Sequence, residues 1–131
     1  MVEITGNELK DTLIRIIEEV RKNPEYKIGK LYKVAAIFLA VGEIKNEPSL
    51  LVLSDYIITA PNKFRNLLSF SYQIAGSPLE EKFSELSRNL NNFFDELKKC
   101  SNALSGEIET DRIMESLRKL EDLYATLPSI E

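Results

Sequence analysis

A chain of 131 residues with 44% hydrophobic and 29% charged side chains has the length and composition of one folded domain, which excludes a disordered tail or a fibre. Its net charge of -4 excludes a basic field over the whole protein, since residues 1–66 carry ten basic and nine acidic side chains and residues 67–131 carry seven and twelve. The absence of histidine and the single Cys100 exclude a Ser-His or Cys-His nucleophile, an internal disulfide framework and a Cys-rich zinc site. An enzyme that uses a carboxylate or a lysine as its base is the remaining alternative, but we expect no catalytic residues, no metal site and no cofactor.

The first predicted element is a helix that begins at Gly6, behind a capping box formed by Thr5 and Glu8. Apolar residues then recur at spacings of three and four, which predicts one buried face. Arg21 and Lys22 precede an Asn-Pro pair, and their charges suit a helix C-terminus. We expect the helix to end there.

The stretch Leu31–Val41 differs from its neighbours because apolar side chains occupy both of its helical faces. Its three alanines favour a helix over a strand, and Gly42 is the expected C-cap. The uncharged run Val34–Gly42 is far shorter than the about 20 residues that a membrane-spanning helix needs. We therefore predict the central helix of a bundle, surrounded by the other helices, and no transmembrane segment.

Residues 43–76 are ambiguous. The segment Pro48–Ala60 lies before a second proline, Pro61, and can be a short helix or a strand; the place of Pro48 in a first turn favours the helix. Pro61 is expected to end this element, and Asn62 to cap a further helix that stops at Gly76.

The last third of the chain carries the clearest pattern. Ser77 and Glu80 form a second capping box around Pro78, and a heptad repeat predicts one helix of about 40 Å over Pro78–Leu104. A second heptad run over Ile113–Leu127 predicts an antiparallel helical hairpin. We therefore predict a single all-α domain over residues 1–131, an irregular bundle of about five helices with a long C-terminal hairpin.

Five basic residues lie close together around the junction of the first two predicted helices, interleaved with two tyrosines. The five are Arg21, Lys22, Lys27, Lys30 and Lys33. Cations that alternate with aromatic rings can neutralise phosphates and stack on bases, so this basic cluster is a candidate nucleic-acid or anion-binding site. The alternative is a solvated turn whose lysine stems cover the core.

Phe94 directly follows the heptad residue Phe93 and lies about 100° around the helix from it. Its side chain either widens the stripe into a core shared by several helices or projects toward another chain as a partner-binding residue. We expect the core and keep the partner contact as the alternative. Cys100 lies on the same stripe, where a thiol acts as a small hydrophobic group.

The character of the whole chain resembles a group of viral proteins. Short length, one Cys and two Met, no histidine, and abundant Ile, Leu, Lys and Glu in helical patterns make it similar to small structural proteins of viruses that infect hyperthermophilic archaea, particularly the two-tailed lemon-shaped kind. This resemblance implies a virion component that packs against copies of itself or other shell proteins. It assigns no functional positions.

Two functional hypotheses follow. The first is a non-enzymatic structural or interaction protein, for which the resemblance implies a homo-oligomer in the virion or the host cytoplasm. The N-terminus shows no signal peptide, so we expect no secretion by that route. The second rests on a similarity to the small helical subunits of RNA-guided antiviral complexes, which would place nucleic acid on the basic cluster.

Overall fold

The structure is a computed structural model that describes residues 6–78, 80–83 and 85–127. Within these residues every regular element is helical, which confirms the all-α prediction. The elements are α1 (Gly6–Lys22), α2 (Pro24–Lys27), α3 (Leu31–Ile44), α4 (Pro48–Gln73), α5 (Leu86–Asn102) and α6 (Thr110–Thr126), with 3-10 turns at Ile28–Lys30 and Glu80–Phe83. None of these helices is long and apolar enough to cross a membrane.

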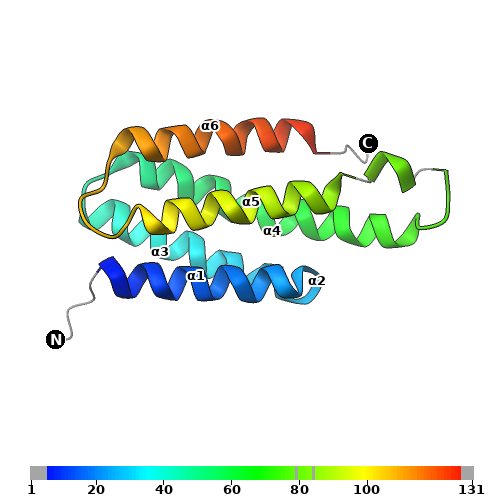
Figure 1. Ribbon diagram of the computed structural model, residues 1–131, viewed down its shortest axis with the longest axis horizontal. Helices are drawn as coiled ribbons and strands as arrows, with labels where there is room; N and C mark the ends of the chain where they lie inside the picture. Colours follow the sequence, from blue (N-terminus) through cyan, green and yellow to red (C-terminus); the bar gives the residue numbers. More distant parts are fainter. Residues whose placement is uncertain (1–5, 79, 84, 128–131) are drawn as a thin grey trace.

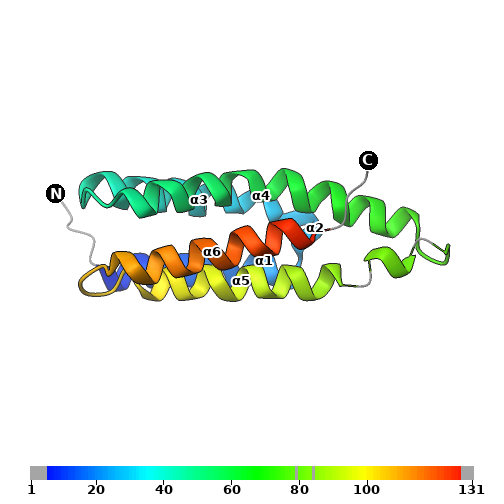
Figure 2. The ribbon, with the colours of Figure 1, turned by 90° about the horizontal axis from the view of Figure 1, so that it is seen from above.

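The five long helices form two layers (Figures 1 and 2). Figure 2 shows α3 and α4 along one side of the bundle and α1, α5 and α6 along the other. Helix α5 packs between α1 and α6, whereas α1 packs on α3 and α4 packs on α6 to join the layers. The predicted C-terminal hairpin is confirmed, because α5 and α6 run side by side after a short turn.

Helix α1 has the predicted bounds, from Gly6 to Lys22. Its apolar stripe is buried, with Leu13, Ile17 and Val20 fully covered. The Thr5 side of the predicted capping box lies outside the described residues.

The prediction that Leu31–Val41 is surrounded by the other helices is wrong. Helix α3 packs mainly on α4 and α1, so only one of its two apolar faces is buried. Gly42 is not its C-cap, because α3 continues to Ile44 and Asn46 takes the left-handed conformation, with φ 52°, in the turn. A Cβ on Gly42 would lie 2.9 Å from Cδ2 of Leu51, so the glycine permits the close approach of α4.

Pro61 does not end a helix, contrary to the prediction, and the segment Pro48–Ala60 is helical. Helix α4 runs through Pro61 to Gln73. A proline inside a helix removes one backbone hydrogen bond and usually kinks or breaks it. Here Pro61 is itself buried, and the apolar face continues from Ile57 to Phe64, so packing on both sides offsets the lost bond.

The predicted helix over Pro78–Leu104 is also too long. A 3-10 turn at Glu80–Phe83 precedes α5, which begins only at Leu86. Glu80 does cap a backbone group, but Oε2 of its carboxylate accepts from the N–H of Gly76 at 3.4 Å; Leu79 lies outside the described residues. Figure 1 shows this turn beyond the ends of α1 and α6, where α5 would have no neighbour in its own layer. Helices in proteins depend on such packing more than on their own propensity.

Candidate interaction surfaces

The structure divides the basic cluster. Arg21 joins α1 to α5: its Nη2 donates to the backbone oxygen of Asn91 at 3.0 Å and pairs with Asp95, while Nη1 lies 3.6 Å from Glu18. Its guanidinium also lies over the ring of Phe94, 5.8 Å from the centroid. Arg21 is therefore engaged by α1 and α5 of the same chain rather than available to an external phosphate.

Lys30 is also paired internally, with its Nζ 2.8 Å from Oε2 of Glu19. This bond holds the pKa of Glu19 below its ordinary value. Lys22, Lys27 and Lys33 are exposed, and none of them forms an ion pair within the described residues. The interleaved tyrosines differ too, since Tyr26 is 77% exposed whereas the hydroxyl of Tyr32 lies 3.5 Å from Oδ1 of Asn62 on α4.

Phe94 is buried, so the alternative that it contacts a partner is wrong for this chain. Its side chain is 1% exposed, and its ring lies edge-on to Phe93 at a centroid separation of 5.8 Å. Phe93 in turn packs on Phe64 of α4 and Tyr124 of α6. The expected core between several helices is the observed position.

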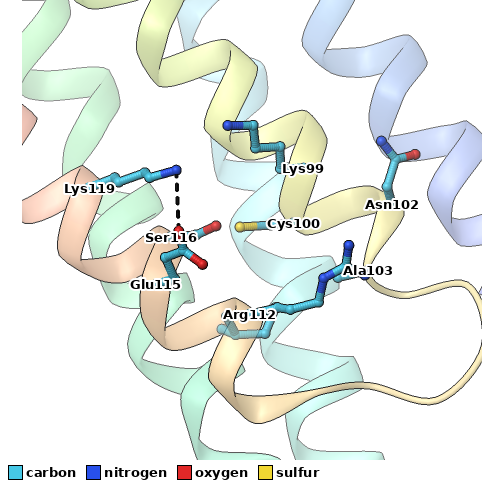
Figure 3. A pocket seen from close by; sticks show the side chains of 9 residues that line it. Lys99, Cys100, Asn102, Ala103, Arg112, Glu115, Ser116 and Lys119 are labelled. Carbon is cyan, nitrogen blue, oxygen red and sulfur yellow. Dashed lines mark ion pairs between the residues drawn. The ribbon is translucent and has the colours of Figure 1, made fainter.

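A groove between α5 and α6 holds two adjoining hollows of about 310 and 400 Å³. Figure 3 shows the first hollow. Cys100 of α5 and Ser116 of α6 lie at its centre, and three basic side chains surround them: Lys99, Arg112 and Lys119. Each of these cations pairs with a carboxylate. Nζ of Lys99 lies 3.2 Å from Oε1 of Glu96, and Nζ of Lys119 lies 3.6 Å from Oε1 of Glu115. Nε of Arg112 lies 3.9 Å from Oε2 of Glu109. The groove therefore offers no strong charge to an anionic ligand.

Cys100 is 1% exposed, and burial raises the pKa of its thiol to about 11. A thiol with so high a pKa is a poor nucleophile near neutral pH. Its place on the heptad stripe agrees with the expected role as a small hydrophobic group. Among the described residues, no group of three or more His, Cys, Asp or Glu side chains is arranged to hold a metal ion.

Sequence reasoning missed an exposed apolar surface, which lies on α3. Seven side chains of this helix are exposed and form what we call the α3 outer face: Tyr32, Lys33, Ala36, Leu39, Ala40, Glu43 and Ile44. Five of the seven are apolar, and Tyr32, Leu39 and Ile44 are 41%, 43% and 80% exposed. Helix α4, in the same layer, exposes Val52 and Ile58 to a similar degree. The signal was present, because a helix that is apolar all round needs cover on every side.

The chain matches no protein-family model, no curated protein and no solved structure.

Proposed function

We propose that this protein is a non-enzymatic structural protein that assembles with copies of itself through the α3 outer face. The observation that carries the proposal is the exposure of Leu39, Ile44 and Tyr32 on a helix with no charged side chain between Lys33 and Glu43. Exposed apolar residues scattered singly are normal, but a continuous apolar helix face is typical of a protein contact.

The chemistry of the chain supports a role in assembly rather than catalysis. The sequence has no histidine, and the one thiol is buried with a raised pKa. The whole-chain resemblance to small virion proteins supports the same class of function and suggests a shell component as the setting. Contacts between shell proteins need a stable fold and a complementary surface, and no reactive group.

The native mass in solution tests the proposal. We expect a species heavier than the 15.0 kDa chain, measured by size-exclusion chromatography with light scattering. Leu39→Glu places a charge in the middle of the face and should reduce the mass to that of one chain while the far-UV circular dichroism stays helical. Ser87→Glu is the matched control, because it adds the same charge at an exposed position of α5 and should leave the mass unchanged.

Two results would count against self-assembly. One is a wild-type mass of a single chain up to millimolar concentration. The other is a Leu39→Glu protein that keeps the wild-type mass, which would show that the contact between copies lies on another surface.

Nucleic-acid binding is the second candidate, and one observation favours it. Tyr26 is 77% exposed and stands among Lys22, Lys27 and Lys33, which have no ion pair within the described residues. Only three of the five cluster cations are free for phosphates, however, which predicts weak affinity. If phosphates are neutralised, affinity for single-stranded RNA must fall steeply with added salt. A titration that shows no binding at low salt would exclude this candidate.

A further inference from the structure

The residues of the α3 outer face are arranged almost symmetrically about the middle of the helix. Six of the seven run, in chain order, large, basic, small, small, acidic, large: Tyr32, Lys33, Ala36, Ala40, Glu43 and Ile44. Successive spacings of these six are one, three, four, three and one residues, which read the same from either end. Leu39 departs from the symmetry, because the equivalent residue on the other side of the centre, Ile37, is half-buried. The two charges have opposite sign and occupy equivalent places on the two sides of the centre.

Both charges lack partners in the isolated chain. Neither Lys33 nor Glu43 forms an ion pair within the described residues, whereas exposed charges elsewhere on the bundle do, such as Arg88 with Glu85 and Arg112 with Glu109. An apolar face flanked by two unpaired charges of opposite sign is complementary to the same face of a second copy when the two helices run in opposite directions.

The small side chains fix where two copies would approach. Ala36 and Ala40 are one helical turn apart, about 6 Å along the axis, and lie on the same side of α3. Small residues at a helix crossing allow interaxial distances near the lower limit of about 8 Å. The larger Tyr32 and Ile44 lie beyond them, toward the two ends of the face.

We propose that the α3 outer face binds a second copy of this chain, with the two α3 helices antiparallel about a two-fold axis near Ala36 and Ala40. This inference rests on the proposed self-assembly and names its geometry. The antiparallel order brings Lys33 of each copy toward Glu43 of the other, whereas a parallel order would place like charges together. Opposed helix macrodipoles also favour the antiparallel order. A two-fold contact uses the same face on both copies and closes, so this face yields a dimer.

Charge reversal tests the geometry. Lys33→Glu alone places acidic residues against acidic residues at both ends of the contact, and Glu43→Lys alone does the same with lysines. Each should raise the dimer dissociation constant about tenfold or more at low salt. The double variant, Lys33→Glu with Glu43→Lys, restores both opposite-sign pairs and should recover dissociation close to that of the wild type.

Lys22→Glu is the matched control, since it reverses another exposed, unpaired lysine that lies outside α3, at the end of α1, and should leave the dissociation constant unchanged. All variants alter exposed side chains, and circular dichroism checks that each stays folded. If both single variants dimerise as tightly as the wild type, or the double variant fails to recover, the antiparallel geometry is overturned while self-assembly stands. A wild-type protein that stays monomeric overturns both.

Discussion

The two layers of the bundle turn different surfaces to the solvent. Every exposed side chain of α5 is polar or charged, as expected for a helix that meets water on its outer side. On α3, five of the seven exposed side chains are apolar. The inner sides of the two helices do not differ in this way. Both carry a fully buried aromatic ring, Phe93 on α5 and Phe38 on α3.

This contrast separates two reasons for an apolar residue in the sequence. On α5 every apolar side chain is buried against other helices of the same chain. On α3 the fold accounts for one face only, so the other requires a contact outside the chain or a cost in solubility. The outward half of α3 is therefore where we expect selection for assembly rather than for folding.

The largest predicted difference is in the free energy of unfolding of variants at two adjacent residues of α3. Phe38 is fully buried and Leu39 is 43% exposed. Phe38→Ala should lower the free energy of unfolding by about 3–5 kcal/mol, because it removes a core ring and leaves a cavity. Leu39→Ala should change it by less than about 0.5 kcal/mol in the monomer. Urea unfolding of dilute protein measures both, and equal losses would mean that Leu39 is covered within a single chain.

The second prediction, of intermediate size, is a pH dependence of stability caused by the buried Cys100 of α5. Burial raises the pKa of Cys100 from its ordinary value near 9 to about 11, so the folded chain keeps a proton that the unfolded chain releases. This contribution to stability is fully present below pH 9 and is lost as the pH rises to 11. We expect a fall of roughly 2 kcal/mol in unfolding free energy over that range.

Cys100→Ala isolates the contribution of the thiol. Its stability should fall less between pH 9 and 11 than that of the wild type, as measured by urea unfolding at fixed pH values. Tyr124 adds a fall in the same direction above pH 10, because burial raises the pKa of its phenol, so the variant should not become independent of pH. An identical fall in both proteins would show that Cys100 is not buried in solution.

The smallest predicted effect concerns the one acidic side chain buried on α5. Glu96 is 8% exposed; its Oε1 lies 3.2 Å from Nζ of Lys99, and its Oε2 is buried without a hydrogen-bond partner. Nζ of Lys119 lies 3.7 Å from the same Oε1. Glu96→Met should leave stability unchanged or raise it by about 1 kcal/mol, since both lysines return to water. The exposed Glu115→Met is the control, with an expected change below about 0.5 kcal/mol. A loss of more than 2 kcal/mol in the thermal or urea unfolding of Glu96→Met would show that the ion pair is net stabilising.

Local patterns predicted part of the candidate sites as well as the helices. The spacing around Phe93 predicted that Phe94 would join a core, and it does. The basic cluster was visible in the sequence, but the contacts of Arg21 with Asn91 and Asp95 were not, because those partners lie 70 and 74 residues away in the chain. A contact between distant segments leaves no trace in the periodicity of either one.

The sequence by itself determined that the chain is helical, where α1 begins and ends, and which side of α1, α5 and α6 is buried, because these follow from periodicity and termini over a few turns. Only the tertiary structure decided that α4 continues through Pro61, that α5 begins at Leu86 and not near Pro78, and which apolar face of α3 stays exposed. The physical reason is the same in the three cases. A proline, a helix end or an apolar face is stabilised or left open by the surfaces that pack beside it, and those surfaces come from other parts of the chain.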